Sequence, residues 1–124
     1  MKNGLALLAA LLAGCTAIGH ERVEGWPALE IVEHYVPHHE MRDRCVRYTG
    51  FGMSPEACAE FDLVHRKCHI WFSADFPPQP FIVEHERLHC AGYDHVGSKA
   101  MAGWLRLYQA AQPPGPSAAA GASQ

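Results

Sequence analysis

The sequence predicts a small α+β domain in which a short antiparallel sheet packs against two helices. Three observations support this prediction. Apolar residues alternate with polar ones over residues 28–36, as they do in a half-buried strand. Two further β-prone runs, residues 61–64 and 68–72, are separated by a short polar turn. Nearer the C-terminus, apolar residues recur at helical spacing over residues 99–111, which indicates a helix that covers the sheet.

The 124 residues divide into four segments by composition. Residues 1–14 read as a signal peptide, residues 15–27 as a polar tether, and residues 28–111 as one folded domain. Residues 112–124 are rich in Pro, Ala, Gly and Ser and are expected to be disordered. The formal net charge is −3, without a basic run or an aromatic-basic patch, so no nucleic-acid partner is expected.

The N-terminal segment combines a charge at Lys2 with an apolar run over residues 5–12 that is too short to span a bilayer. It ends in Leu-Ala-Gly-Cys at residues 12–15, which resembles the lipobox of bacterial lipoproteins. That resemblance implies that Cys15 carries a diacylglyceryl group and a further acyl chain such as palmitate, and that the domain is anchored at the cell envelope. Because Thr16 follows instead of Asp, it also favours the outer membrane, facing the periplasm. An ordinary secretory signal is the alternative.

The elements of the domain follow from local signals. A strand over residues 28–36 is stopped by a proline, and residues 38–49 are equally compatible with a helix and with a loop. Ser54 and Pro55 predict the start of a short helix that reaches about Ala59. The β-prone runs over 61–64 and 68–72 then form a hairpin.

The stretch HERLHCAGYDH, residues 85–95, carries the candidate site. On the expected helix over residues 81–91, His85 and His89 lie one turn apart on the same face, where two imidazoles can hold one metal ion. Gly92 follows where the helix must end, since glycine accepts the left-handed backbone that turns the chain out of a helix. That turn would bring His95 back as a third ligand. The fourth position would stay open for water, as a catalytic zinc site requires.

Two acidic residues accompany these histidines. Glu86 lies on the same helical turn, so it can sit beside the metal without binding it and can take a proton from the attacking water. Asp94 is the rival acid: it could bind the metal in place of His95, or orient one of the histidine ligands from outside the coordination shell. The second role is favoured because His95 completes the pattern.

The pattern H-E-x-x-H-x-x-G-x-x-H resembles the metzincin clan of zinc metallopeptidases, which implies His85, His89 and His95 as ligands, Glu86 as catalytic base, and a zincin-like fold. Metzincins also place a methionine turn beneath the zinc, whereas Met101 lies on the apolar stripe of the last helix and is expected in the core. The end of the stretch, LHCAGYDH, also resembles the bacterial rRNA-maturation endoribonucleases, which carry H-x-x-x-H-x-x-G-Y-D-H.

Four cysteines remain beside the lipobox cysteine, and an even number in a small exported domain predicts disulfides. The more local pairing, Cys45–Cys58 with Cys68–Cys90, is preferred among the three possible pairings. The second bridge would fasten the site helix to the strand before it. A mixed Cys/His metal site is the alternative, although the spacings lack a C-x-x-C pair.

The sequence therefore predicts a zinc-dependent peptidase of the cell envelope with one Zn²⁺ per chain. Its substrate would be a peptide or protein, which a partner in the envelope could present because so short a chain has little room for deep pockets. In zincin-like folds the strand before the site helix often borders the cleft and pairs with extended substrate, so residues 68–72 are either that strand or an ordinary core strand. The alternatives are a metal-binding lipoprotein without catalysis and a hydrolase of another bond, phosphodiesters included.

Overall fold

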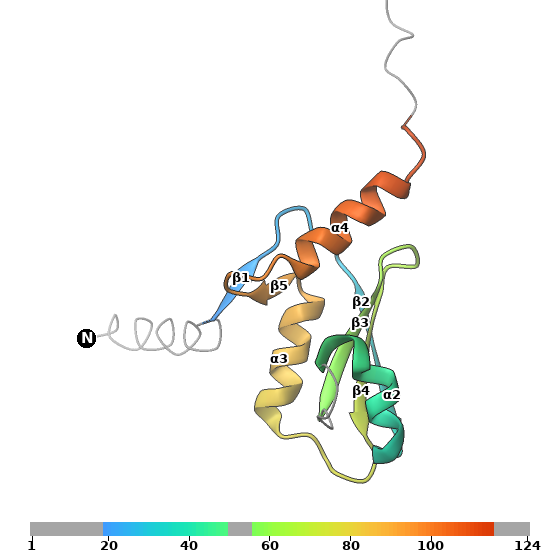
Figure 1. Cartoon of the computed structure of the whole chain (residues 1–124), viewed down its shortest axis with the longest axis vertical. Helices are drawn as coiled ribbons and strands as arrows, with labels where there is room; N and C mark the ends of the chain where they lie inside the picture. Colours follow the sequence, from blue (N-terminus) through green and yellow to red (C-terminus); the bar gives the residue numbers. More distant parts are fainter. Residues whose placement is uncertain (1–18, 50–55, 116–124) are drawn as a thin grey trace, which may run out of the picture.

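The computed structural model describes residues 19–49 and 56–115, and their elements form a small α+β domain, as the sequence predicts (Figure 1). The segment assigned to the signal peptide, Cys15 and the Ser54–Pro55 helix start lie outside the described residues. No helix in the described part of the chain is long and apolar enough to cross a membrane. In chain order the elements are β1 (His20–Arg22), β2 (Glu30–Val36), α2 (His38–Thr49), β3 (Ala57–Asp62), β4 (Lys67–Ser73), α3 (Pro80–Cys90), β5 (Tyr93–His95) and α4 (Ala100–Ala111).

The main sheet has the strand order β2-β4-β3 and is mixed, which corrects the expectation of a purely antiparallel sheet. Strand β4 pairs antiparallel with β3 and parallel with β2. Strands β3 and β4 form a hairpin and so run in opposite directions. Strand β4, not β3, lies beside β2 and runs parallel to it. The short strands β1 and β5 form a separate antiparallel pair.

Two segments differ from their predicted structure. Residues 38–49, whose sequence is equally compatible with a helix and with a loop, form helix α2. Residues 57–59, expected to end a short helix, belong instead to β3, where Ala57, Ala59 and Phe61 contact the core cluster beneath α3. The hairpin turn lacks glycine, as expected. Arg66 takes the left-handed conformation there (φ 57°), while Asp62 accepts hydrogen bonds from the His65 backbone N–H (3.0 Å) and ring (2.7 Å).

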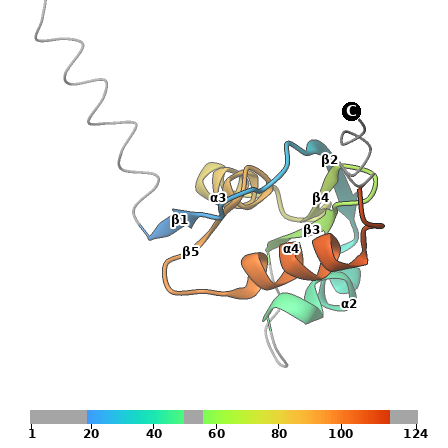
Figure 2. The same cartoon turned by 90° about the horizontal axis from the view of Figure 1, so that it is seen from above.

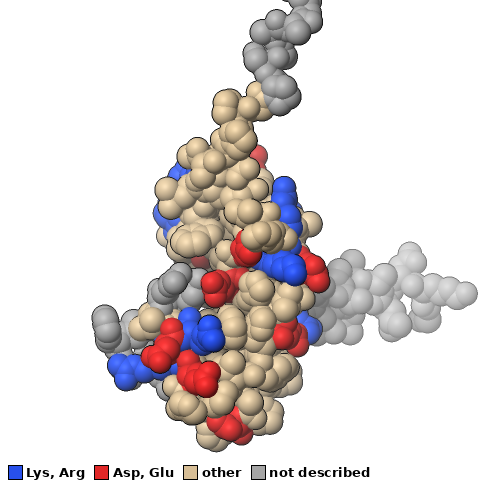
Figure 3. Space-filling view, turned by 90° about the vertical axis from the view of Figure 1, so that its right-hand side faces the viewer, with Lys and Arg blue, Asp and Glu red and all other residues tan. Residues whose placement is uncertain are grey.

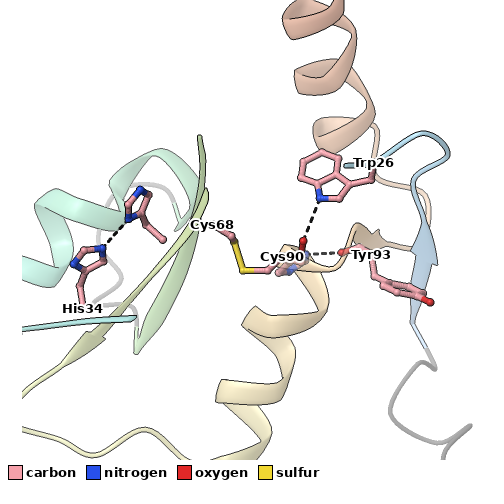
Figure 4. Close-up of a disulfide and its surroundings, with 7 residues drawn as sticks. Trp26, His34, Cys68, Cys90 and Tyr93 are labelled. Carbon is pink, nitrogen blue, oxygen red and sulfur yellow. Dashed lines mark hydrogen bonds between the residues drawn. A yellow bond between two sulfur atoms is a disulfide. The ribbon is translucent and has the colours of Figure 1, made fainter. Parts of the chain in front are cut away.

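The sheet is covered on both faces. Helix α3 packs on the face that presents Cys68, Ile70 and Phe72, and α2 packs on the opposite face, where Met41 and Cys45 meet Trp71. Each helix is fastened by one disulfide: Cys45–Cys58 joins α2 to β3, and Cys68–Cys90 joins β4 to α3 (Figure 4). The preferred pairing is therefore confirmed.

The folded part of the chain begins before residue 28, which corrects the boundary of the tether. Residues 20–22 form β1, and Val23 and Trp26 are buried together with Leu63 and with Met101 and Leu105 of α4. Figure 2 shows this segment running past α3 on its way to β2. The tether appeared polar because its two buried apolar side chains are separated by Glu24 and Gly25. Met101 is a core residue, as predicted.

Gly92 ends α3 with a left-handed backbone (φ 95°), and its N–H donates to the carbonyl oxygen of His89. A Cβ at Gly92 would lie 2.7–2.8 Å from buried Trp26, whose indole N–H donates to the carbonyl oxygen of Cys90 (3.2 Å; Figure 4). We expect Gly92→Ala to lower the free energy of unfolding by about 2–5 kcal/mol, because overpacking adds to backbone strain. Gly97→Ala is the control, since Gly97 also has positive φ but open space around it. Urea unfolding should show a smaller loss, about 1–2 kcal/mol, for the control; equal losses would contradict the Trp26 clash.

Candidate metal centre

The three predicted histidine ligands converge on one point. His85 and His89 project from successive turns of α3, and His95 is returned by the Gly92 turn to the end of β5. The Nε2 atom of His85 lies 3.1 Å from that of His89 and 3.2 Å from that of His95. Two imidazoles bound tetrahedrally to one zinc ion, at about 2.0–2.1 Å each, would have nitrogen atoms about 3.3 Å apart. Both separations from the His85 nitrogen are thus close to those that a tetrahedral ion requires.

The tautomer of His89 is fixed by the backbone. Its Nδ1 lies 2.7 Å from the carbonyl oxygen of Tyr93, which can only accept a hydrogen bond, so Nδ1 carries the proton (Figure 4). In the neutral ring, Nε2 then presents its lone pair to the other histidines. This arrangement, in which the remaining ring N–H of a ligand is held by a carbonyl, is the usual one for metal-binding histidines.

Burial favours the neutral form of the His85 and His89 rings. Desolvation lowers the pKa of His89 to about 4, with a smaller contribution from the neighbouring histidines, although the hydrogen bond to Tyr93 opposes the shift. The pKa of His85 is lowered by desolvation and by His20 and His95. At neutral pH each ring therefore keeps one nitrogen without a proton, and that nitrogen is available to a cation.

A fourth histidine, which the sequence analysis missed, joins the group. His20 lies on β1 directly opposite His95 on β5, and one ring nitrogen from each of His20, His85, His89 and His95 lies within 4.8 Å of the other three. No local signal marked His20, because it lies far from the motif in sequence and strand pairing alone brings it there. The cluster of four histidines could hold a metal ion.

Asp94 is not part of this cluster. Its carboxylate accepts hydrogen bonds from the backbone N–H groups of His95 (2.8 Å) and Met101 (3.0 Å), and so ties β5 to the start of α4. Burial alone would raise the pKa of Asp94, but the hydrogen bonds from Met101, Ser98 and His95 lower it overall. Of the two rival third ligands, the structure brings His95 to the other histidines and assigns Asp94 to the turn.

Glu86 lies beside the cluster without belonging to it. Its side chain is buried, with 8 % exposed, and no hydrogen bond or ion pair joins it to another described residue. Desolvation raises its pKa to about 7. Glu86 faces a cavity of about 490 Å³ that lies between α3, β3 and α4. Its lining also includes His85, His89, His95, Ala59, Phe61 and Trp104. A carboxyl with a pKa near 7 is suited to proton transfer at neutral pH.

The buried carboxyl predicts a pH-dependent stability of the metal-free protein. The folded state holds the Glu86 proton between pH 4.5 and about 7, where the unfolded state has released it, so stability falls as pH rises through that window. His89 acts oppositely: its lowered pKa means that stability falls as pH drops from 6.5 to about 4. In the wild type the two dependences offset each other over most of this range.

Glu86→Gln should therefore reveal the pH dependence of stability that His89 contributes. Compared with the metal-free wild type, the variant should gain stability as pH rises from 4.5 to 8, by up to about 3 kcal/mol at the usual 1.36 kcal/mol per pKa unit. Urea unfolding in the presence of a chelator at pH 4.5, 6 and 8 measures this gain. Glu84→Gln, two residues earlier and exposed, is the matched control. A difference from wild type that does not change with pH would contradict the buried ionisation.

Comparison with known proteins does not assign the chain to a class: no protein-family model, curated protein or solved structure matches it. The chemistry of the site therefore rests on the geometry of its own residues.

Proposed function

We propose that this chain is a zinc-dependent metallopeptidase, anchored at the bacterial cell envelope through Cys15. The observation that carries the proposal is the position of Glu86. A buried carboxyl that pairs with no other residue in the described part of the chain lines the same cavity as His85, His89 and His95, yet stays outside the group of possible ligands. A site that only stores a metal has no need of such a group, whereas hydrolysis needs a base within reach of water.

The residues divide the work as follows. His85, His89 and His95 would hold the ion, and the carbonyl of Tyr93 fixes the orientation of the His89 ring. A bound zinc ion would supply Lewis acidity toward the scissile carbonyl and the attacking water. Glu86 accepts the proton of that water on its carboxylate and passes it to the leaving amine. The buried setting keeps bulk water from solvating the carboxylate, which keeps it basic enough for this exchange.

The cavity favours a peptide over a phosphodiester. None of the described residues that line it is Lys or Arg, so these residues offer no cationic side chain to a phosphate. On the one face of the molecule that Figure 3 shows, acidic and basic residues are interspersed, with no basic stripe. These features support a peptide or protein substrate, and a partner in the envelope could present it.

The strand that would receive an extended substrate is β3. Strand β4, which the sequence made a candidate, is paired on both sides, so its backbone has no free edge. Among the described strands β3 pairs with β4 alone, and its residues Ala57, Ala59 and Phe61 line the cavity. An extended peptide added along β3 would lie across the mouth of the site, with main-chain hydrogen bonds giving affinity.

A second candidate function is metal binding without catalysis. The observation that favours it is His20, because four protein ligands would complete a tetrahedral shell and leave no position for water or substrate. This candidate gives Glu86 no role.

The experiment that tests the proposed function combines metal analysis with cleavage of a peptide library. The full chain, purified with both disulfides formed, should contain one zinc ion and cleave members of the library. Activity should disappear with a chelator and return when zinc is added back. Bound zinc with no cleavage of any peptide would favour the second candidate.

Anchoring at the envelope is tested separately. Because Cys15 ends a lipobox-like sequence, we expect cells that express the chain to incorporate labelled palmitate into it and the Cys15→Ser variant to incorporate none. Cys68→Ser is the matched control, since Cys68 is engaged in a disulfide and should not affect labelling. Equal labelling of Cys15→Ser and the wild type would end the lipoprotein assignment.

A further inference from the structure

His20 stands apart from the other histidines by the state of its ring nitrogens. Nδ1 and Nε2 are both buried, and neither has a hydrogen-bond partner among the described residues. A buried polar group that is left unsatisfied destabilises the folded state, so such groups are normally paired or bound to an ion. Among the described residues Trp71 Nε1 is also buried without a hydrogen-bond partner, but it does not lie in a group of possible metal ligands.

The position of His20 is that of a ligand. Its ring centroid lies 4.9, 5.6 and 5.2 Å from those of His85, His89 and His95, whereas the latter three are 4.7–5.1 Å from one another. Four rings with six similar separations stand at the corners of a slightly stretched tetrahedron. An ion at its centre would give the unpartnered ring of His20 the contact that it lacks.

We propose that His20 is a fourth metal ligand and that it closes the resting metal centre to water and other external ligands. This goes beyond the three-histidine pattern in the motif, which leaves one coordination position open. If the proposed peptidase function also holds, on which this consequence rests, the resting chain is latent, and His20 must leave before a substrate carbonyl can approach the ion.

The attachment of β1 permits that departure. The strand has three residues, and Glu21 and Arg22 beside His20 are exposed. It is held by its short pairing with β5 and by the contacts Val96 N–H to Gly19 O (2.9 Å) and Gly97 N–H to the carboxylate of Glu21 (3.2 Å). Beyond it, Val23 is buried and donates its N–H to the carbonyl oxygen of Gly92 (2.8 Å). Residues 20–22 can therefore separate from β5 while the core behind Val23 stays intact.

The test replaces zinc with Co²⁺ in the full chain, because the visible spectrum of Co²⁺ reports its ligands while Zn²⁺ is silent. Azide is the probe for an open coordination position. We expect the spectrum of wild-type protein to stay unchanged at azide concentrations that saturate His20→Ala. We also expect His20→Ala to bind zinc at least about 10- to 100-fold more weakly in a chelator competition, since loss of even an outer partner has that effect.

Two further variants serve as controls for this test. His39→Ala removes an exposed histidine of α2 and should behave as wild type. His20→Asn serves if His20→Ala fails to fold, as judged by its near-ultraviolet circular dichroism. If wild type and the His20 variants take up azide equally and bind zinc equally, His20 is not a ligand and the inference is overturned.

The effect of His20 on peptide cleavage is measured in a separate experiment. An open state that is populated at about 0.1–10 % in the wild type would make the His20 variants about 10- to 1000-fold faster on a peptide substrate. If only the His20 variants take up azide and no form of the protein cleaves any peptide, His20 is supported as the fourth ligand and the proposed peptidase function is refuted. If wild type and His20→Ala cleave the peptide equally fast and both bind azide, His20 is not a fourth ligand, and the proposed peptidase function is still supported.

Discussion

Glu86→Gln should leave the zinc content of the protein unchanged and lower peptide turnover by about 10²–10⁴, the contribution ascribed to a general base. The amide has nearly the shape of the carboxyl and fills the same buried position, but it cannot accept the proton of the attacking water. Glu86 lies outside the histidine cluster, so its replacement removes no possible ligand. Single-turnover cleavage of a library peptide, with metal analysis of the same sample, measures both quantities.

The control for this experiment is Glu84→Gln, an exposed glutamate on the same helix. It makes the same change of side chain but lies outside the cavity, so its turnover should match wild type. Full activity in Glu86→Gln would refute the assigned base, whereas loss of both zinc and activity would show that residue 86 supports the metal site structurally.

His89→Ala should lose zinc more severely than substitution of a residue outside the coordination shell, which costs about 10- to 100-fold in affinity. It removes one nitrogen of the tightest part of the cluster, 3.1 Å from His85, and leaves the Tyr93 carbonyl without its ring partner. His85→Ala should have a similar effect, since His85 contacts both other motif histidines. Chelator competition followed by elemental analysis gives the affinities.

His39→Ala is again the matched control, because it removes one imidazole from an exposed position. Its zinc content should equal that of the wild type. If His85→Ala and His89→Ala retained zinc as well as this control, the metal would be bound elsewhere and the assigned site would be wrong. Circular dichroism of each metal-free variant separates loss of ligand from loss of fold.

Local sequence determined the part of the site that lies on α3 and its exit. Two histidines four residues apart on a helix share a face whatever the rest of the fold does, and the Gly92 turn with φ 95° returns His95 within three residues. The disulfide pairing followed from the same proximity along the chain, since each bridge joins cysteines 13 or 22 residues apart. Amphipathic spacing likewise located α4 and placed Met101 in the core.

Tertiary structure decided what depended on distant pairing. His20 reaches the cluster only because β1 pairs with β5, and a three-residue strand in a polar segment has too little hydrophobic pattern to reveal that pairing. The central place of β4, and hence the edge of β3 that no described strand pairs with, depends on how both faces of the sheet pack against α2 and α3. Burial of Glu86 also arises from that packing, because desolvation depends on every element around a group and not on its neighbours in sequence.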